Sequence, residues 1–525
     1  MQVRSGVKPI DVLSPLDGRP LGSFEPCRES AVSGAVATAR REFDRWSVLP
    51  IAARASAIRE LRRLVLARAD DIVDLVSAVT GKVPTEALLG EVYPVLDLLQ
   101  YYEANAAKIL ARRKVPTSPL AYPFSHAYVD QRPFGVVAVI SPWNFPLQLS
   151  LIPAATALIA GNSVCLKPSE LSLPVGELIG GLFQQVEAFG DALQVVPGDG
   201  ETGRLLVEAP PDFIFFTGSV ASGQAIMAAA AGSLTPLILE LGGKDAMLVF
   251  GDAPLERAVR AAVYGAFSNS GQMCVAVERC YVQRELYPAF VAAAVAETAK
   301  LRVGAGTDRE LGAITSPAQI GIIEAHYHDA LAKGAKASGP LRREGSFVHP
   351  VVLWDVSHDM ALMRDETFGP LLPVMPFDTE DDAVRLANDS GFGLNGSVWT
   401  ADVERGQGIA ARLNLGGCAI NDVIKNVGHA GLPFGGVKRS GFGRYHGPEG
   451  LLSFTQPVAV LANAGRMSME PNWFPYSEQH YRDLRGFVDF VFGEGNTLSR
   501  VQRNWQALKS FRQYFTFNLR QKLHP

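Results

Sequence analysis

One cysteine lies where a thiol could be reactive. Cys274 follows the small and flexible residues 270–273 (Ser-Gly-Gln-Met), and we expect it to be exposed near the N-terminus of a helix or turn. That position lowers the pKa of a thiol and favours the nucleophilic thiolate. An inert, buried thiol is the general alternative, because cysteine is among the most buried residue types. We apply that alternative to Cys165, Cys280 and Cys418, which we assign to packing.

Glu240 is a candidate general base. It directly follows the apolar run PLIL (residues 236–239) and is the second residue of the segment LELGGK (residues 239–244). Burial at the end of a strand raises the pKa of a carboxyl group toward the range of a useful base. A lone glutamate is more often a surface or ion-paired residue. The two glycines after Glu240 would permit a ligand to come close, and they favour the functional interpretation.

Two glycine-rich turns could bind a phosphate. Residues 198–203 have the pattern G-x-G-x-x-G after the apolar run LQVV, but no acidic residue stands about twenty positions further on, so a plain turn is an equal alternative. The second turn, residues 216–223, follows FIFF and offers backbone N–H groups to an anion. Lys167 and Glu170 follow another strand and could bind ribose hydroxyls. We expect these groups to converge on one crevice at the carboxyl ends of the strands.

The elements that must position these residues predict an α/β fold. Residues 29–112 have the apolar spacing of helices, which should form an outer layer. Between residues 133 and 250, short apolar runs alternate with helical stretches, as in a parallel sheet. After Gly251 the alternation repeats, with helices near 254–270 and 284–300, which predicts a second α/β domain. Residues 121–135 are typical of an extended arm that could reach a neighbouring subunit.

Composition excludes several classes of protein. The chain has 525 residues, of which 47% are hydrophobic and 19% charged, so it is globular and long enough for more than one core. A formal charge of −4 argues against nucleic acid as a partner. Five cysteines without a C-x-x-C pair argue against a metal site and favour a reducing, cytoplasmic location. No signal-type segment begins the chain, and no apolar run of about 18 residues could span a membrane.

Seven short motifs occur in the following order: SPWNFP (141–146), KPSE (167–170), FTGS (216–219), LELGGK (239–244), GQMC (271–274), ETFGP (366–370) and PFGGVKRSG (433–441). With them, residues 10–460 resemble the NAD(P)-dependent aldehyde dehydrogenase superfamily. The 34-residue step from Glu240 to Cys274 also matches that family. Residues 421–423 (Asn-Asp-Val), LPFGG and residues 445–447 (Tyr-His-Gly) are similar to the class 3 and fatty or coniferyl aldehyde branch, whereas residues 14–24 (SPLDGRPLGSF) are more similar to the longer class 1 and 2 proteins.

The resemblance implies a fold with a Rossmann-type dinucleotide-binding domain, an α/β catalytic domain and a small β arm for oligomerisation. The implied ranges are 1–117 and 135–241 for the NAD(P)-binding domain, 242–444 for the catalytic domain, 118–134 and 445–460 for the arm, and 461–525 for a C-terminal extension. A homodimer is favoured, with a tetramer as the alternative.

The resemblance also assigns chemistry to particular residues. Cys274 would attack the aldehyde carbon, and the side-chain amide of Asn144 with the backbone N–H of Cys274 would stabilise the oxyanion. Hydride would pass to the nicotinamide and leave a thioester, and Glu240 would activate the water that hydrolyses it. Met273 and Phe434 would line the aldehyde tunnel.

Fifteen residues would bind the cofactor: Ile140, Ser141, Trp143, Lys167, Ser169, Glu170, Gly200, Phe216, Thr217, Gly218, Ser219, Ser222, Leu241, Glu366 and Phe368. Glu170 would accept hydrogen bonds from the adenosine ribose and repel a 2′-phosphate, so NAD is favoured over NADP. We expect an apolar aldehyde, either aromatic or of medium to long chain. The alternatives are a succinic-type semialdehyde dehydrogenase, a CoA-acylating enzyme, and a catalytically silent structural relative.

The C-terminal extension carries a further pattern. Between residues 498 and 523 the apolar residues recur at steps of three and four, and six basic residues occupy the opposite face. This pattern predicts a basic amphipathic helix. Such a helix most often packs against protein, and it can also lie in a membrane interface. We hypothesise that the extension covers the substrate entrance or makes a peripheral membrane contact.

Overall fold

The computed structural model describes residues 8–119 and 121–511. The chain divides into two units: unit 1 is Met1–Leu110 with Arg132–Gln456, and unit 2 is Ala111–Gln131 with Pro457–Pro525. None of the described helices is both long and apolar enough to span a bilayer. The predicted α/β class is confirmed, whereas the predicted boundaries of the binding domain, catalytic domain and arm stay predictions.

The first sheet of unit 1 has six strands in the order β19-β9-β8-β5-β6-β7. Its parallel strands are β5 (Val136–Ile140), β6 (Ser163–Lys167), β7 (Leu193–Val195), β8 (Phe213–Thr217) and β9 (Leu237–Glu240), and β19 (Gly441–Phe442) pairs antiparallel with β9. β5, β6 and β8 are buried along their whole length. Parallel strands of this kind require cover on both faces, which explains their continuous apolar sequences.

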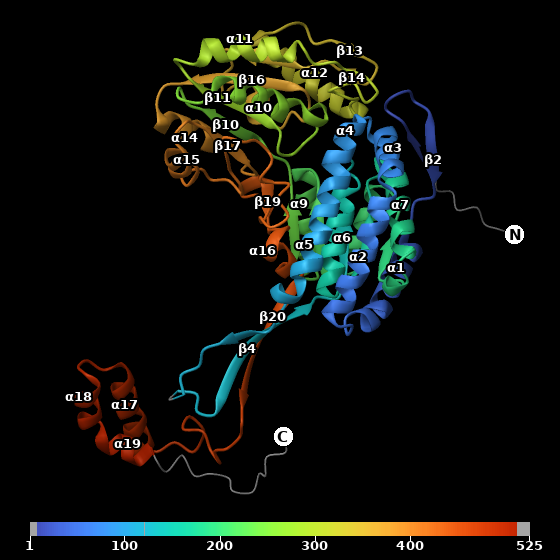
Figure 1. Cartoon of the computed structure of the whole chain (residues 1–525). Coiled ribbons are helices and arrows are strands. Elements are labelled where there is room, and N and C mark those ends of the chain that lie inside the picture. The colour runs from blue at the N-terminus through green and yellow to red at the C-terminus, as the bar shows by residue number, and fades with distance from the viewer. Residues whose placement is uncertain (1–7, 120, 512–525) are drawn as a thin grey trace, which may run out of the picture. The chain divides into compact units, whose positions relative to one another are not determined.

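Helices cover both faces of this sheet (Figure 1). One face packs on α2 (Ile51–Ala67), α3 (Ala69–Thr80), α5 (Tyr93–Ile109), α6 (Gln148–Ala160) and α7 (Leu173–Gln184), and the other on α1 (Glu29–Trp46), α8 (Gly200–Glu208) and α9 (Val220–Ala230). Successive side chains of β5 point to opposite faces of the sheet. Val137 and Val139 therefore lie in the core on the α2 side, and Ala138 and Ile140 lie in the core on the α1 side.

The second sheet has seven strands in the order β12-β15-β16-β11-β10-β17-β18. These strands are β10 (Asp245–Val249), β11 (Val277–Gln283), β12 (Lys336–Ala337), β15 (Val351–Trp354), β16 (Leu371–Phe377), β17 (Gly396–Trp399) and β18 (Ala419–Ile420). α10 (Leu255–Phe267) and α11 (Tyr287–Thr298) confirm the two predicted helices and pack on one face, opposite α12 (Pro317–Ala332) and α14 (Glu380–Asn388).

The remaining elements of unit 1 are short: β1 (Ile10–Leu13), β2 (Pro20–Phe24), α4 (Pro84–Ala87), a π-helix (Leu88–Val92), β13 (Arg343–Glu344), β14 (Phe347–Val348), α13 (Ala361–Arg364), α15 (Val403–Ala410) and α16 (Gly447–Leu452). Four 3-10 turns complete the unit: Glu170–Ser172, Glu187–Phe189, Ser268–Gly271 and Lys438–Ser440.

A three-stranded sheet of β3 (Arg113–Val115), β4 (Ser125–Pro133) and β20 (Thr455–Asn463) leads into unit 2. It is followed by α17 (Glu478–Phe492), α18 (Thr497–Arg503) and α19 (Trp505–Phe511). The prediction of one continuous helix from residue 498 is therefore wrong in its described part, because α18 ends before Asn504 and α19 begins after it. The Asn504 side chain there donates to Arg500 and Asp489. Residues 512–523 of that prediction lie outside the described residues.

Candidate active site

Cys274 lies in the loop between α10 and β11. The loop begins with three successive left-handed residues, Asn269 (φ 51°), Ser270 (φ 54°) and Gly271 (φ 74°). A side chain at Gly271 would meet the backbone of Gly369, so glycine is required there. Left-handed asparagine and serine persist only where the surroundings hold them, and this loop is held at its start by a buried carboxylate.

That carboxylate belongs to Glu86 of α4. Its Oε1 accepts hydrogen bonds from the Asn269 N–H (2.7 Å) and the Ser268 hydroxyl (3.0 Å). The Ser270 hydroxyl donates to the Gly312 carbonyl at 2.9 Å and fixes the middle of the loop. The loop that carries the thiol is therefore tied to distant segments of unit 1.

The surroundings of the Cys274 thiol differ from the prediction. The residue is half-buried, and it lies in a turn before β11. Burial raises the pKa of its thiol, and the neighbouring carboxyl groups of Glu366, Asp245 and Glu240 raise it further. The expected lowering by a helix or turn N-terminus is wrong, because nearby acids and desolvation both favour the protonated thiol.

Asn144 lies in the loop between β5 and α6. Its side chain is buried, and the amide nitrogen donates to the Gln272 carbonyl at 3.1 Å, two residues before the thiol. The Asn144 carbonyl accepts a hydrogen bond from the Lys82 ammonium at 2.9 Å. This contact holds the main chain of Asn144 in place from the other side.

Lys82 also forms a fully buried ion pair with Glu91 of the π-helix, at 2.8 Å. The other Glu91 oxygen accepts the N–H groups of Leu147 (3.0 Å) and Gln148 (2.9 Å) at the start of α6. A carboxylate is favourable at a helix N-terminus. Our sequence reasoning missed Lys82, Glu86 and Glu91. The available signal was a set of charged residues in an otherwise apolar helical stretch.

Glu240 is the last residue of β9, as predicted, and it is buried. Neither of its carboxyl oxygens has a hydrogen-bond partner among the described residues. Burial raises its pKa well above the usual value, against a smaller opposing effect of Arg444. The predicted direction of the pKa shift is confirmed.

The glycines after Glu240 permit close packing of two protein loops, whereas the prediction was that they would let a ligand come close. A side chain at Gly243 would overlap the Cys274 carbonyl, and one at Gly242 would overlap the Glu366 carboxylate. Both residues therefore let the cysteine loop and the Glu366 loop pack on segment 239–244. Gly243 also donates its N–H to Glu366 at 3.0 Å. Burial and the nearby Glu278 raise the pKa of Glu366 to about 8.

A cavity of about 280 Å³ brings the three predicted catalytic residues together. Asn144, Glu240 and Cys274 line it, along with Glu366 and Phe368. The Phe368 ring lies edge-on to Trp143, with 5.6 Å between ring centres. The Phe368 backbone N–H donates a hydrogen bond to Glu278, which also pairs with the buried Lys244. This network fixes the ETFGP loop against the cavity.

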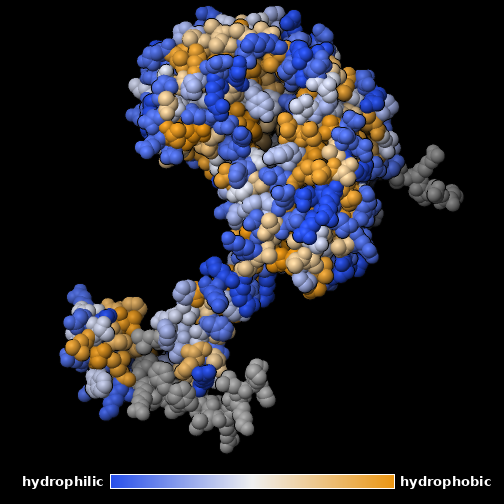
Figure 2. Space-filling model, viewed as in Figure 1, coloured by the Kyte–Doolittle hydropathy of each residue, from blue (hydrophilic) through white to orange (hydrophobic). Residues whose placement is uncertain are grey.

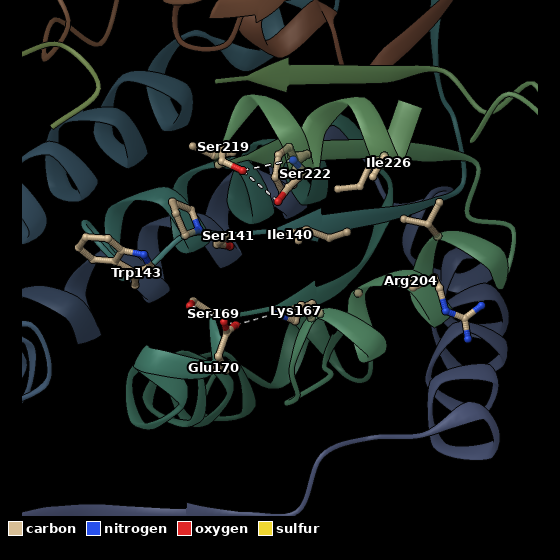
Figure 3. A pocket seen from close by; sticks show the side chains of 18 of the residues that line it. Ile140, Ser141, Trp143, Lys167, Ser169, Glu170, Arg204, Ser219, Ser222 and Ile226 are labelled. Atoms are coloured by element: carbon tan, nitrogen blue, oxygen red, sulfur yellow. Dashed lines mark hydrogen bonds and ion pairs between the residues drawn. The ribbon is translucent and has the colours of Figure 1, made fainter. Parts of the chain in front are cut away.

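A second cavity, of about 410 Å³, shares five lining residues with the first: Pro142, Trp143, Thr217, Gly218 and Ser219. Figure 3 shows Ser219 and Ser222 on one side of it, and Lys167 with Glu170 on the other. All fifteen predicted cofactor residues line one or both cavities. Met273 and Phe434 line neither cavity: Phe434 belongs to the apolar core of unit 1, and Met273 packs against that core beside Cys274.

The second cavity fits a dinucleotide. Ser219 caps α9 by accepting the Ser222 N–H at 3.2 Å, so the positive helix end faces the cavity. The buried hydroxyls of Ser141 and Thr217 have no partner among the described residues and could bind a ligand. Beyond them, the lining is apolar, as an adenine ring requires: Val207, Ala225, Ile226 and Ala229.

The 198–203 turn contributes to this cavity only in part. Gly200 and Gly203 line it, whereas Asp199 caps α8 and pairs with Arg28 at 2.9 Å. Arg204 lies at the same edge, but ion pairs with Glu201 and Glu208 compensate its charge. Sequence reasoning did not select Arg204.

A crevice that fits a dinucleotide, joined to a cavity lined by a thiol, a carboxyl group and an amide, defines the class of NAD(P)-linked oxidoreductases with a cysteine at the reacting centre. Residues 2–460 match the aldehyde dehydrogenase family model. The chain belongs to the aldehyde dehydrogenase family and is an oxidoreductase that acts on aldehydes.

Individual relatives agree with this family. The chain is 53% identical to a 4,4′-diapolycopene aldehyde oxidase of Methylomonas sp over 513 residues, which cover 98% of this chain and 97% of the relative. It is 35% identical to a protein of Mycobacterium ulcerans provisionally named an NADP(+) succinate-semialdehyde dehydrogenase, covering 86% and 88% of the two chains. A Mycobacterium tuberculosis aldehyde dehydrogenase crystallised with NAD+ superimposes with a TM-score of 0.83, 34% identity and coverage of 89% and 96%.

Proposed function

We propose that the protein oxidises a long apolar aldehyde to its carboxylic acid with NAD, through a thioester on Cys274 that water hydrolyses. The observation that carries this proposal is the shared cavity: Asn144, Glu240 and Cys274 line the same space, and both Glu240 oxygens lack protein partners among the described residues. A buried carboxyl group without a partner is costly to the fold, which supports a functional reason for its position.

The residues divide the work as follows. Cys274 attacks the aldehyde carbon as a thiolate, after its thiol releases a proton to solvent water; burial together with nearby carboxyl groups makes that release unfavourable at neutral pH. Asn144 stabilises the oxyanion, since its amide already lies beside the cysteine loop. NAD, when bound, accepts the hydride. Glu240 takes a proton from the water that attacks the thioester, a role favoured by its raised pKa.

Two features support an apolar substrate. Among the described residues that line the catalytic cavity there is no lysine or arginine to hold a distal carboxylate. Phe434 and Tyr445 belong to the apolar core of unit 1, against which Cys274, Met273 and Phe145 pack. The relative with 53% identity is named for a diapolycopene aldehyde, which makes such a compound the first long substrate to try.

NAD is our first choice of cofactor. Lys167 is buried and lies 3.5 Å from the Glu170 carboxylate, whose side chain is 47% exposed toward the crevice. That carboxylate suits ribose hydroxyls and disfavours a 2′-phosphate. We also propose a homodimer in the cytoplasm, with subunits joined through the sheet of β3, β4 and β20. Light scattering would separate this dimer from a tetramer.

The test is NADH formation by the purified protein with acetaldehyde, hexanal, dodecanal, benzaldehyde, succinic semialdehyde and a diapolycopene aldehyde. Each assay is run with and without CoA, with NAD or NADP, and with Cys274→Ala alongside. We expect cysteine-dependent turnover with NAD, independent of CoA and fastest for the long apolar compounds. Fastest turnover of succinic semialdehyde would support the semialdehyde alternative, and CoA dependence would support the acylating one.

A further inference from the structure

The C-terminal extension differs in charge from the rest of the chain. Residues 461–525 contain nine of the 49 Lys and Arg residues and five of the 53 Asp and Glu residues. The formal charge is therefore +4 for this segment and −8 for residues 1–460. By its net charge the extension would be attracted to an anionic surface, whereas residues 1–460 would be repelled.

One face of α17 packs against the two helices that follow. Gly486 of α17 lies against Ala507 of α19, so closely that a side chain at Gly486 would meet it. Asp489, on the same side, accepts hydrogen bonds from Arg503 (2.8 Å) and Asn504. The described helices α17–α19 thus form a small helical unit with a defined inner face.

The opposite face of α17 is apolar. Tyr481, Leu484, Val488, Val491 and Phe492 recur at steps of three and four on the side turned away from Gly486, and we name them the apolar stripe. Tyr481 is 70% exposed and Phe492 82% exposed, and Val488 is also exposed. An apolar helix face in water is unfavourable and usually marks an interaction surface.

Other exposed aromatic residues belong to the same unit. Trp473, Phe474 and Tyr476 precede α17, and Trp505 begins α19; all four are exposed. Figure 2 shows apolar surface gathered over α17–α19, with hydrophilic surface along its outer margin. Arg485 of α17 lies beside the apolar stripe, and Arg482 lies one turn of the helix before it on the same side; both are exposed.

We propose that the apolar stripe and the aromatic residues before α17 dock on an anionic lipid membrane. Exposed aromatic residues beside cations suit the boundary between headgroups and acyl chains, and the described helices are too polar to cross it. The link between docking and substrate rests on the proposed function: a long apolar aldehyde dissolves in the bilayer, so docking would bring the enzyme to it.

The similarity to one relative continues through the C-terminal extension. The family model ends at residue 460, but the similarity to the diapolycopene aldehyde oxidase covers 98% of the chain, so it includes most of residues 461–525. The extension is therefore shared with a relative named for an apolar aldehyde.

The test is co-sedimentation of the full-length protein with vesicles of phosphatidylcholine alone or mixed equally with phosphatidylglycerol. We expect binding to the anionic vesicles, at least about tenfold weaker for Tyr481→Glu/Phe492→Glu. The matched control Leu234→Glu/Val403→Glu adds the same two charges at exposed apolar residues of unit 1 and should leave binding unchanged. Raising NaCl from about 0.1 M to about 1 M shortens the Debye length from about 10 Å to about 3 Å and should weaken binding.

Oligomer size and hexanal oxidation are measured on the same samples. Normal hexanal turnover and unchanged size in the double variant, with loss of vesicle binding, would support docking. No vesicle binding by the wild type would overturn it, and a smaller oligomer in the double variant would then assign the stripe to a second copy of the chain. A wild type that binds vesicles but oxidises no aldehyde would contradict the proposed function and leave the docking proposal standing.

Discussion

The buried ammonium of Lys82 donates a hydrogen bond to the main-chain carbonyl of Asn144 at 2.9 Å while it pairs with Glu91 at 2.8 Å. Through this one side chain, the segment after α3 positions the loop that carries the candidate oxyanion donor. The same Glu91 caps the start of α6. The geometry of the cavity thus depends on a charge pair outside it.

Lys82→Met should destabilise the protein and lower kcat. The substitution leaves the Glu91 carboxylate buried without its partner, which typically costs about 3–5 kcal/mol of unfolding free energy. Lys336→Met is the matched control, because that lysine pairs with Asp355 on the surface, where such pairs contribute about 0–1 kcal/mol. Thermal unfolding and steady-state rates measure both effects. Equal behaviour of the two variants would contradict the role of Lys82.

Alkylation of Cys274 by iodoacetamide should be slow at neutral pH and accelerate as pH rises. Burial and the neighbouring acids raise the pKa of the thiol, and only the thiolate reacts. Above about pH 8, where Glu366 is ionised, Glu366→Gln should react faster than the wild type, because it removes a negative charge that disfavours the thiolate. Glu208→Gln, whose side chain lines neither cavity, should leave the rate unchanged. Mass spectrometry of the peptide that contains Cys274 follows the reaction; a faster rate in acid than in base would contradict the assigned pKa direction.

Glu170→Gln should shift cofactor preference toward NADP. The wild-type carboxylate lies in the crevice near Lys167, and its removal ends repulsion of a 2′-phosphate while leaving that ammonium in place. We expect the ratio of kcat/KM for NADP to that for NAD to rise by about tenfold, equal to about 1.4 kcal/mol. Glu177→Gln of α7, which lines neither cavity, is the control. An unchanged ratio would show that Glu170 does not determine the preference for NAD over NADP.

Much of the site could be predicted because its residues stand at the ends of apolar strands. Lys167, Thr217 and Glu240 end three parallel strands of the same sheet, and the carboxyl ends of such strands meet at one edge. The second sheet could also be predicted, because apolar runs alternate with helical stretches again after Gly251. The family motifs then supplied the roles that strand pattern alone leaves open.

The residues that support the loops could not be predicted in this way. Glu86 binds Asn269 across 183 positions of sequence, and Lys82 binds Asn144 across 62, so no local pattern marks either contact. The direction of the thiol pKa shift could not be predicted, because it follows from burial of the thiol and from three acids that distant segments bring near Cys274. The helix break at Asn504 depends on its bond to Asp489, which helical periodicity alone does not reveal.

The most direct test of the central claim is to trap the covalent intermediate. Glu240→Gln is mixed with NAD+ and dodecanal, and the mass of the peptide that contains Cys274 is measured by mass spectrometry. We predict a burst of one NADH per active site, a dodecanoyl group bound to Cys274 as a thioester, and slow turnover afterwards, because the base that activates water is missing. Absence of the acyl group, or steady NADH formation by Cys274→Ala, would contradict the proposed mechanism.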